Sequence, residues 1–306
     1  MSSKTVVVFT ATGEQGSSVV GSLLKAGWKV IALTRSFESE SAKALKAKGA
    51  ELAKADLNDP ESYKPALKGA DAAFVNADFW AIYGANKGDG EAAAKGETQQ
   101  AKNAIQACVD AGVGHIVYST LDGGLGAKHW DSKQEVSKWT VAHNLPVTNL
   151  YMTFYFSNIT RAGLVTPKDD GSGSFVLGIP APDGTVVPGV APEQTGLWVE
   201  KILSSPGEYK GKDVHACSDV LSIADMAKTL SDLSGKDVQP LHLPLEAFNS
   251  DGLKAKLGEE LWDQWDLFVK HDLKRDPKAS RALVQGSWDF KEWAAQNAQL
   301  KKVLGY

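Results

Sequence analysis

Short apolar runs rich in Val and Ile alternate with amphipathic helical patterns through the first half of the chain. This alternation is typical of βαβ units, in which helices cover both faces of a parallel sheet. The apolar runs predict strands at Thr5–Phe9, Lys29–Leu33, Glu51–Ala55, Ala72–Asn76, His115–Ser119 and Val147–Tyr151. The patterns between them predict helices near Glu14–Ala26, Ser39–Lys48, Pro60–Leu67, Glu91–Ala111 and Ser132–His143. Because crossovers between parallel strands are right-handed, we expect an α/β fold with a doubly wound sheet and a ligand crevice at the carboxyl ends of its strands.

The pattern changes after residue 152. The stretch "PKDDGSGSFVLGIPAPDGTVVPGVAP" is rich in Gly, Pro and Asp and predicts loops with at most a short hairpin. Helical patterns follow at Pro192–Leu203 and Ile223–Ser234, and the final third carries Leu, Trp and Phe at helical spacing. We therefore predict a first domain over residues 1–152 and a smaller, mainly helical lobe over residues 153–306, from which some segments return to the first domain.

The composition of the 306-residue chain is that of a globular protein, because an apolar content of 43% is enough for a sizeable core. The formal net charge is -4 and the Lys and Arg residues are scattered, which argues against direct binding of nucleic acid. Any role in gene control would then act through a regulatory protein partner. No apolar run reaches the roughly 18 residues needed to span a bilayer. We expect a soluble, cytoplasmic protein, with the nucleus as a second candidate location.

The cysteines and histidines show no metal-binding pattern. Cys108 and Cys217 have neither metal-ligand spacing nor the spacing of a disulfide framework, so we predict two buried thiols in a reducing compartment. Five of the six histidines show no convergent spacing and are given no metal role: His115, His143, His215, His242 and His271. No metal site is predicted.

The first predicted strand runs into a loop that contains two glycines, "FTATGEQG". Its spacing is that of a dinucleotide-binding loop, except that Thr10 stands where the first of three glycines is expected. In such loops the glycines allow a tight turn, close approach of the backbone to a pyrophosphate, and close packing of helix on strand. We predict a dinucleotide site here, with a purely structural turn as the alternative.

Arg35 follows the second predicted strand, in "VIALTRSFES", and no acidic residue precedes Glu38 there. An acidic residue at this place accepts the ribose 2′-hydroxyl of NAD, whereas an arginine suits the 2′-phosphate of NADP. The sequence therefore favours NADP(H), the alternative being a solvated surface arginine. Asp56 and Leu57, in "KADLND", lie where such folds place the adenine, and a loop-capping aspartate is the alternative there.

Several segments together resemble the NmrA-like family of atypical short-chain dehydrogenase/reductase relatives, and within it the NADPH-sensor proteins of animals. The resemblance spans nearly all of the chain and is carried by "VVVFTATGEQGSSV", which is similar to a family loop written G-x-T-G-x-Q-G, and by "VIALTR", "GAELAKADLND", "AAFVNADFW", "HIVYSTL", "HWDSKQEVSKW", "YMTFYFSNI" and "DFKEWAAQ". It implies a Rossmann-type domain with a smaller helical lobe, NADP bound across the strand ends, and a sensing or regulatory role.

The resemblance also implies a set of cofactor-binding residues. Carried over position by position, they are Thr10, Ala11, Thr12, Gly13, Glu14, Gln15, Gly16, Arg35, Asp56, Leu57, Ala77, Asp78, Phe79, Lys133, Phe154, Tyr155, Phe156 and Ser157. Thr10 departs from the family glycine, and we expect it to keep an extended conformation from which its hydroxyl can reach the pyrophosphate. A scaffold whose dinucleotide site has decayed at Thr10 is the alternative.

His129 and Lys133 are one helical turn apart, at the spacing at which active relatives carry a catalytic tyrosine and lysine. In those relatives the lysine holds the nicotinamide ribose and lowers the pKa of the tyrosine, which passes a proton to a carbonyl. Histidine replaces the tyrosine here, which leaves three interpretations. Either Lys133 holds the ribose and nothing is reduced, or His129 donates the proton to a substrate lying over the nicotinamide. The third is a purely structural His129 outside the crevice.

The aromatic residues leave the same choice open. Phe79, Trp80, Trp130 and the run Phe154 to Phe156 either wall a substrate pocket or pack between two lobes, whereas Trp262, Trp265 and Phe268 suit a lobe core or a partner surface. The first hypothesis is an NADP(H) redox sensor that acts through a protein partner, with the segments "ADFWAIYGANKGDGEA" and "TRAGLVTPKDDGSGS" becoming ordered on cofactor binding. The second is an NADPH-dependent reductase of a small carbonyl or enone substrate. The sequence is also compatible with a homodimer.

Overall fold

The computed structural model describes residues 4–306, which form two compact units. The first unit comprises the chain up to Gly124 together with Lys128–Met152 and Pro192–His215. The second comprises Leu125–Ala127, Thr153–Ala191 and Ala216–Tyr306. Each unit is described by itself below, and the predicted domain boundary at residue 152 stays a prediction.

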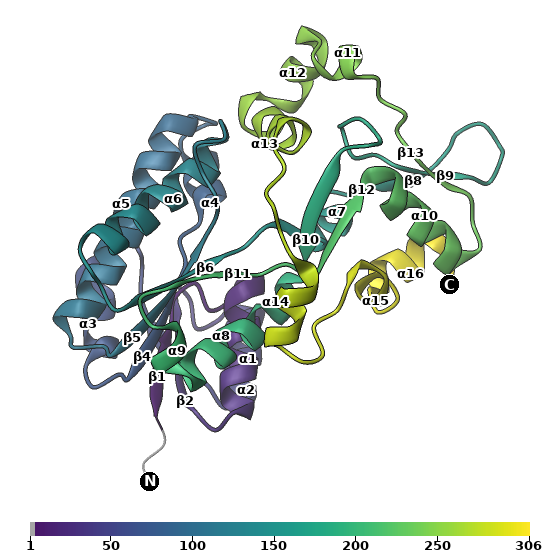
Figure 1. Ribbon diagram of the computed structural model, residues 1–306. Helices are drawn as coiled ribbons and strands as arrows, with labels where there is room; N and C mark the ends of the chain where they lie inside the picture. Colours follow the sequence, from purple (N-terminus) through teal and green to yellow (C-terminus); the bar gives the residue numbers. More distant parts are fainter. Residues whose placement is uncertain (1–3) are drawn as a thin grey trace. The chain divides into compact units, whose positions relative to one another are not determined.

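A parallel sheet of seven strands forms the centre of the first unit, in the order β11-β6-β5-β4-β1-β2-β3 (Figure 1). Its strands are β1 (Thr5–Val8), β2 (Lys29–Thr34), β3 (Glu51–Lys54), β4 (Ala72–Val75), β5 (His115–Thr120), β6 (Val147–Tyr151) and β11 (Asp213–His215). The doubly wound Rossmann-type fold is therefore confirmed. The strand order reverses between β1 and β4, and in open sheets of this kind the ligand crevice lies at that point.

Helices flank this sheet, and four of them begin at a Ser or Asp side chain that caps the first turn. They are α1 (Glu14–Lys25), α2 (Glu40–Ala47), α3 (Pro60–Leu67), α4 (Phe79–Ala85), α5 (Gly90–Asp110), α6 (Lys128–Ala142), α8 (Thr195–Ser204), α9 (Pro206–Tyr209) and the 3-10 helix η1 (Pro192–Gln194). Ser39 caps α2 by accepting from Ala42 N, and Asp59 caps α3 by accepting from Glu61 N.

Two sequence expectations about the helices were wrong. The glycine-rich stretch after β4 was expected to be a loop, yet it contains α4, because Asp78 caps that helix by accepting from Ala81 N at 3.2 Å. Helix α6 begins at Lys128, four residues before the predicted start at Ser132. The Ser132 hydroxyl is not used as a cap, because it donates to Glu97 on α5.

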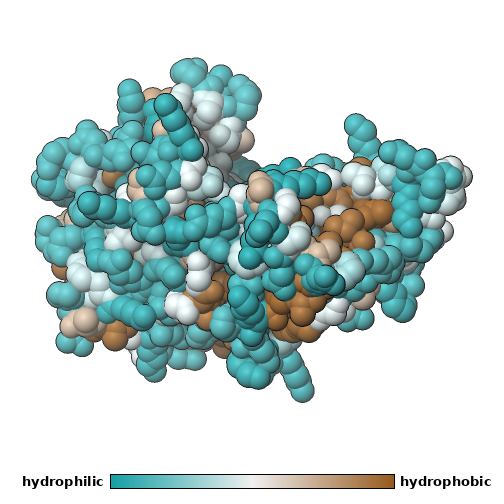
Figure 2. Space-filling view, turned by 90° about the horizontal axis from the view of Figure 1, so that it is seen from above, coloured by the Kyte–Doolittle hydropathy of each residue, from teal (hydrophilic) through white to brown (hydrophobic). Residues whose placement is uncertain are grey.

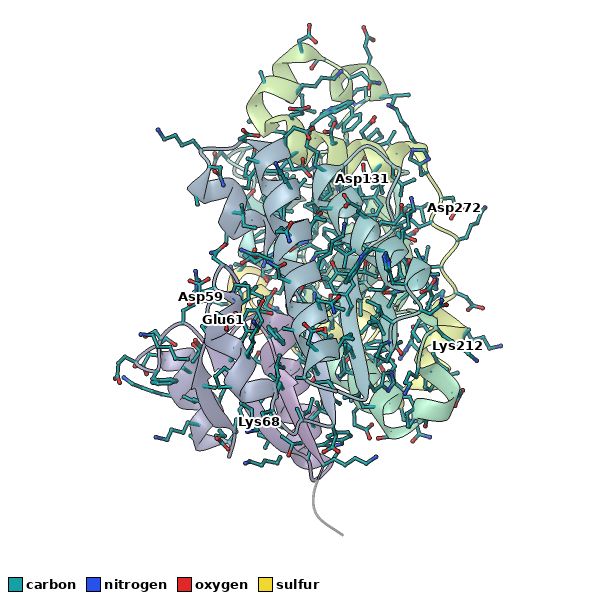
Figure 3. All side chains as sticks on the ribbon, turned by 90° about the vertical axis from the view of Figure 1, so that its left-hand side faces the viewer. Asp59, Glu61, Lys68, Asp131, Lys212 and Asp272 are labelled. Atoms are coloured by element: carbon teal, nitrogen blue, oxygen red, sulfur yellow. The ribbon has the colours of Figure 1, made fainter. Side chains whose placement is uncertain are left out.

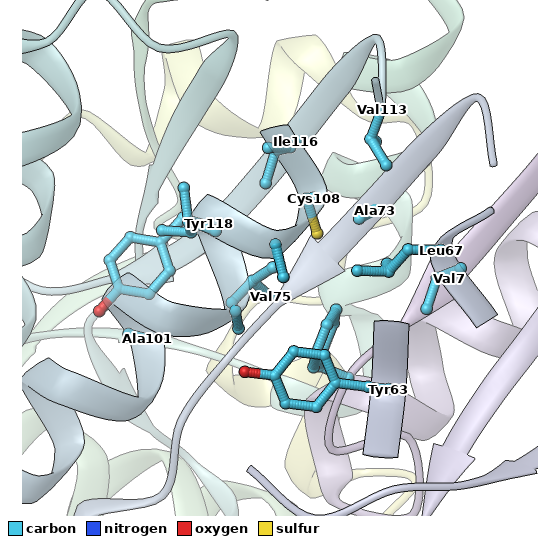
Figure 4. Close-up of a cluster of buried hydrophobic side chains, with 14 of the residues drawn as sticks. Val7, Tyr63, Leu67, Ala73, Val75, Ala101, Cys108, Val113, Ile116 and Tyr118 are labelled. Carbon is cyan, nitrogen blue, oxygen red and sulfur yellow. The ribbon is translucent and has the colours of Figure 1, made fainter. Parts of the chain in front are cut away.

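The core of the first unit lies where α3 and α5 pack on the sheet. Figure 4 shows Tyr63, Leu67, Cys108 and Tyr118 in this cluster, and all four side chains are fully buried. Burial raises the pKa of the Cys108 thiol well above its usual range. Both cysteines are free and buried, as the sequence predicts.

The second unit contains two three-stranded sheets, ordered β12-β10-β7 and β13-β9-β8. Their strands are β7 (Phe154–Tyr155), β8 (Val165–Pro167), β9 (Phe175–Leu177), β10 (Val186–Val190), β12 (Asp219–Ser222) and β13 (Val238–Pro240). Its helices are α7 (Ser157–Arg161), α10 (Ile223–Ser234), α11 (Leu245–Phe248), α12 (Asp251–Leu257), α13 (Glu259–Lys270), α14 (Pro277–Leu283), α15 (Phe290–Ala294) and α16 (Ala298–Leu304). The expected short hairpin is the antiparallel pair β8 and β9. The pairing of β10 with β12 was not expected.

The surface is dominated by hydrophilic side chains on the face drawn in Figure 2, where hydrophobic patches interrupt them. Single exposed apolar side chains, such as Trp80 and Leu245, are also present. No helix within residues 4–306 combines the length and the apolar composition needed to cross a membrane.

Candidate functional site

A pocket of about 440 Å³ lies within the first unit, at the carboxyl ends of β1, β2 and β3. This is the place where the strand order predicts a ligand crevice. One wall consists of the loop after β1 and the ends of β2 and β3, and the other is formed by α4 and by the inner face of α5. The pocket is lined by Phe9, Thr10, Thr12, Gly13, Leu33, Thr34, Arg35, Ala55, Asp56, Leu57, Asn58, Tyr63, Asp78, Ala81, Ile82, Ala85, Asn86 and Gln100.

Thr10 has φ 47°, in the left-handed region, and not the extended conformation that we expected. The loop turns here so that Gly13 N can donate to Thr10 O at 3.0 Å and α1 can begin at Glu14. Left-handed backbone is the reason that a glycine is usual at this position, since a β-branched residue is strained there. The loop thus keeps the turn of a glycine-rich loop although a threonine occupies it.

Two further observations show how tightly this loop is built. A Cβ on Gly16 would lie 2.3 Å from Thr10 O, so only glycine lets α1 approach the loop this closely. Thr10 lines the pocket, and its hydroxyl oxygen is buried without a hydrogen-bond partner among residues 4–306. A buried hydroxyl without a partner costs about 1 to 3 kcal/mol.

Arg35 lies at the pocket just beyond the end of β2, and its side chain is exposed. Thr34 shapes the backbone around it, because its hydroxyl donates to Ser36 O at 3.0 Å and accepts from Ser36 N at 3.2 Å. Within the described chain the Arg35 guanidinium makes no hydrogen bond and no ion pair. Its five N–H donors are therefore available to an anion.

The rim of the pocket beside β3 is ordered by a chain of hydrogen bonds. Gln100 Nε2 donates to Asn58 Oδ1 at 2.9 Å, and the Asn58 backbone and amide nitrogens donate to Asp56 Oδ1 at 2.9 and 3.1 Å. Asp56 thus closes its own loop through Asn58, which was the structural alternative for this residue, and it also lines the pocket with Leu57.

Tyr63 contributes a ring to the same pocket from α3. Burial, followed by the nearby Cys108, Asp59 and Glu61, raises the pKa of the Tyr63 phenol to about 12. Figure 3 shows Asp59 and Glu61 close together at the start of this helix, with Lys68 farther along. The Tyr63 hydroxyl is a second buried group without a partner among the described residues.

The remaining loop residues divide between pocket and core. Thr12 and Gly13 line the pocket, whereas Ala11 is fully buried and Glu14 is exposed on α1. Gln15 is also buried, and its Oε1 accepts a hydrogen bond of 2.8 Å from the Ser119 hydroxyl at the end of β5. The Gln15 side chain therefore ties α1 to β5.

Lys133 lies on α6 with its ammonium at the carboxyl end of β4. Its Nζ is 3.0 Å from Asn76 Oδ1, 3.1 Å from Ala77 O and 3.0 Å from Glu97 Oε1. Glu97 is fully buried on α5 and also accepts from Phe79 N at 3.1 Å and from Ser132 Oγ. Ala77 and Phe79 are likewise buried, while Asp78 lines the pocket.

His129 is buried against aromatic side chains of α4. Its ring centroid is 5.0 Å from that of Trp80 and 5.6 Å from that of Phe79, both at tilted angles. Phe79 in turn stacks on Tyr83 at 5.7 Å. His129 and Lys133 do not line the pocket that holds Thr10 and Arg35. Predicted residues of the first unit therefore fall into two groups, one around the pocket and one on α6.

The predicted residues Phe154, Tyr155, Phe156 and Ser157 belong to the second unit. Phe154 packs on Trp265 and Phe268 with ring centroids 5.5 and 6.4 Å apart, and all three side chains are buried. Phe156 packs in the same way on Phe290 and Trp293. Tyr155 pairs with Val190 between β7 and β10, and Ser157 begins α7. These aromatic residues build the core of their own unit.

Sequence reasoning missed the residues that α4 and α5 contribute. Ala81, Ile82 and Ala85 form the apolar side of the pocket, while Gln100 on α5 reaches its rim. Glu97 was missed as well. A signal was present for the two α5 residues, because Glu97 and Gln100 are polar groups on the buried face of a predicted helix, and such groups need partners.

Residues 2–292, nearly the whole chain, match the model of the NmrA-like family. The chain belongs to the NmrA-like family. Among its relatives in this family, the NmrA-like family domain-containing oxidoreductase cpsB of Aspergillus campestris is 33% identical across 78% of this chain and 75% of the relative. The oxidoreductase ptmS of Penicillium ochrochloron, another NmrA-like protein, is 28% identical across 99% of this chain and 96% of the relative.

Solved structures of NmrA-like and related proteins share the fold. NmrA, a negative transcriptional regulator, in complex with NADP has a TM-score of 0.77 at 21% identity, over 97% of this chain and 95% of that one. An NADPH-dependent quinone oxidoreductase of Escherichia coli, complexed with NADPH, has a TM-score of 0.72 at 22% identity, over 94% of this chain and 97% of that one. These structural neighbours of the NmrA-like chain establish its fold.

Proposed function

We propose that this NmrA-like protein is an NADP(H)-dependent oxidoreductase that binds the dinucleotide in the pocket of its first unit. The observation that carries the proposal is the Arg35 guanidinium, which lies at the pocket without a partner among the described residues. A guanidinium binds a phosphate through charge-assisted, often bidentate hydrogen bonds. Arg35 would hold the 2′-phosphate, which separates NADP(H) from NAD(H).

The rest of the pocket supports this assignment. The loop from Thr10 to Gly13 and the start of α1 would hold the pyrophosphate, and the buried Thr10 hydroxyl would gain the partner that it lacks. Leu57 and the apolar side of α4, formed by Ala81 and Ile82, suit the adenine. Relatives across most of the chain are named oxidoreductases, and neighbouring structures hold NADP or NADPH.

A bound NADPH supplies a hydride, so the chain has to orient a substrate and supply a proton. His129 is the proton donor that we propose, since an imidazole ring carries an N–H that it can donate. Lys133 would orient the ribose by exchanging one of its three protein acceptors for a ribose hydroxyl. The proposed substrate class is a small carbonyl or enone, because the aromatic rings around His129 would favour a planar, conjugated molecule.

Turnover tests the proposal directly. We expect NADPH consumption with at least one member of a panel of quinones, enones and aromatic aldehydes. His129→Phe, which keeps an aromatic ring against Trp80, should lower kcat by about 100-fold or more while NADPH affinity is kept. His143→Phe, at an exposed histidine just beyond the end of α6, is the matched control and should retain activity. Turnover by His129→Phe at the rate of the unmodified protein would contradict the assignment of the proton donor.

The second candidate is a redox sensor that binds NADP(H) without turnover and acts through a protein partner. Two observations favour it: histidine stands in place of the tyrosine, and the neighbouring NmrA structure is that of a negative transcriptional regulator. This candidate predicts no consumption of NADPH with any of the panel. It also predicts that NADPH and NADP+ protect Phe79–Ala85 and the hairpin of β8 and β9 differently against limited proteolysis.

A further inference from the structure

Glu97 is a carboxylate with no exposed surface in the middle of α5. Burial of a charge is costly unless the charge is paired and its oxygens accept hydrogen bonds. Both conditions are met here. Oε1 faces the Lys133 ammonium at 3.0 Å and accepts from Phe79 N at 3.1 Å, while Oε2 accepts from the Ser132 hydroxyl at 2.5 Å. Glu97 thus joins α5 to α6 and to the first residue of α4.

The Lys133 ammonium is held from three sides. Lysine has three N–H donors, and Asn76 Oδ1, Ala77 O and Glu97 Oε1 lie within 3.1 Å of Nζ. All three donors are therefore committed to protein acceptors, and the side chain is only 11% exposed. Of these three acceptors only Glu97 carries a charge, so its carboxylate is the group that balances the charge of the Lys133 ammonium in this buried place.

The same carboxylate fixes one wall of the pocket. Phe79 is the first residue of α4, and the following turns of this helix present Ala81, Ile82 and Ala85 to the pocket. Glu97 itself does not line the pocket. Helix α4 packs closely on α5, since a Cβ on Gly96 would lie 3.1 Å from the Ile82 side chain. The position of this wall therefore depends on the hydrogen bond from Phe79 N to Glu97, a residue that does not itself line the pocket.

We infer that Glu97 is a positioning residue of the dinucleotide site. It holds two parts of the site in one fixed arrangement: the Lys133 ammonium at the end of β4, and the first residue of α4. The inference rests on the proposed function, because it concerns the site where NADP(H) would bind. It assigns Glu97 no contact with the cofactor or the substrate. Its effect on either would pass through Lys133 and α4.

Other titratable groups face this network. Tyr118 approaches Glu97 from β5, and its pKa is raised well above the usual range by burial, then by Glu97 and by Tyr151 of β6. His129 is on the same helix as Lys133.

The test uses Glu97→Gln, with Glu91→Gln as the matched control at an exposed position of the same helix. Without the carboxylate, the buried Lys133 ammonium has no charged partner, so the free energy of unfolding at neutral pH should be lower for Glu97→Gln than for Glu91→Gln. Chemical denaturation measures this loss as a lower midpoint for Glu97→Gln. A Glu97→Gln, Lys133→Met double variant, which buries no unpaired charge, should recover stability relative to Glu97→Gln.

The second readout is affinity for NADPH and NADH by calorimetry at neutral pH. Glu97→Gln should weaken both about fivefold or more through α4, while the ratio of the two affinities, which depends on Arg35, stays unchanged. Equal denaturation midpoints for Glu97→Gln and Glu91→Gln, a double variant no more stable than Glu97→Gln, or equal NADPH affinities would overturn the inference. A protein that binds no NADPH at all would instead contradict the proposed function, and the unfolding data would still show whether Glu97 holds the charge of Lys133.

Discussion

Thr10 is the residue at which sequence and structure disagree most. The spacing of the loop predicts that Thr10 takes part in the turn. We expected an extended backbone for a threonine, but Thr10 has φ 47°. Propensity is a weak guide here, because the turn between β1 and α1 dictates the backbone and the side chain has to follow. The price is local strain and a buried hydroxyl without a partner among residues 4–306.

Thr10→Gly should therefore stabilise the protein in the absence of dinucleotide. We expect a gain of about 1 kcal/mol, since relief of left-handed strain and removal of the orphaned hydroxyl exceed the added flexibility of glycine in the unfolded chain. Asn144→Gly is the control, because asparagine tolerates its φ of 51° and should gain less. Chemical denaturation measures the change in stability of both variants. A loss of stability in Thr10→Gly would contradict the claim that the Thr10 backbone is strained.

His115 gives the fold a pH dependence that is unrelated to the pocket. Its Nε2 lies 2.8 Å from Thr148 Oγ1, whose proton goes to Tyr209 O at 2.6 Å, so Nε2 is the protonated ring nitrogen. Nδ1 has no partner within the described chain. Burial, followed by the charge of Lys210, lowers the pKa of His115 to about 4. The folded protein therefore holds a neutral imidazole.

Stability should fall as the pH is lowered from about 6.5, the ordinary histidine pKa, to about 4, because only the unfolded chain takes up the proton in this range. The expected loss is on the order of 2 to 3 kcal/mol. Urea denaturation across this window measures it in the unmodified protein and in His115→Gln, which should lose most of the dependence. If exposed His143→Gln removes as much of the dependence as His115→Gln, the assignment to His115 is wrong.

At the scale of elements, the close packing of α1 against α8 leads to a prediction about Gly196. Gly196 N donates to Ser18 Oγ at 2.9 Å, and a Cβ on Gly196 would lie 2.4 Å from Ser18 O. Gly196→Ala should therefore destabilise the protein by about 2 kcal/mol or more, because backbone cannot move aside as a side chain can. Thermal unfolding measures the loss.

Gly21→Ala on α1 is the matched control. No atom would lie within 4 Å of its Cβ, so the same substitution should stabilise α1 by about 0.5 to 1 kcal/mol. Equal effects of the two substitutions would show that close approach of α1 and α8 is not what requires glycine at position 196.

The elements also show what periodicity can and cannot predict. Strands β1 to β6 were predicted within a residue or two from their short apolar runs. In β1 the run is buried on both faces, as Val6 and Val7 show, whereas β3 is only partly buried. Helix α4 was missed because two glycines and an aspartate near it suggest a loop, whereas a single cap and contact with α5 are enough to form seven helical residues. The short strands of the second unit carry too few residues to give a periodic signal.

At the scale of the molecule, the sequence predicts the parts of the candidate site whose residues lie close together in the chain. It does not predict contacts between residues that are far apart in the chain. The loop of Thr10 and the end of β2 at Arg35 carry recognisable spacing. Glu97 and Gln100 do not, because their partners Lys133 and Asn58 are 36 and 42 residues away in the chain. Only the fold brings such pairs together. The NmrA-like resemblance includes Lys133 among the predicted site residues but gave no indication of the buried carboxylate beside it.

The central claim is that the pocket binds NADP(H) through Arg35, and calorimetric titration with NADPH, NADP+, NADH and NAD+ tests it most directly. The unmodified protein should prefer the phosphorylated dinucleotides. Arg35→Ala should lose about 10- to 100-fold in affinity for these alone, since a hydrogen-bonded charge pair contributes about 1.5 to 3 kcal/mol. The affinity of Arg35→Lys for the phosphorylated dinucleotides should lie between those of the unmodified protein and of Arg35→Ala. Lys25→Ala removes an exposed cation on α1 and should change none of the four affinities. Equal losses for all four dinucleotides, or no preference in the unmodified protein, would contradict the account.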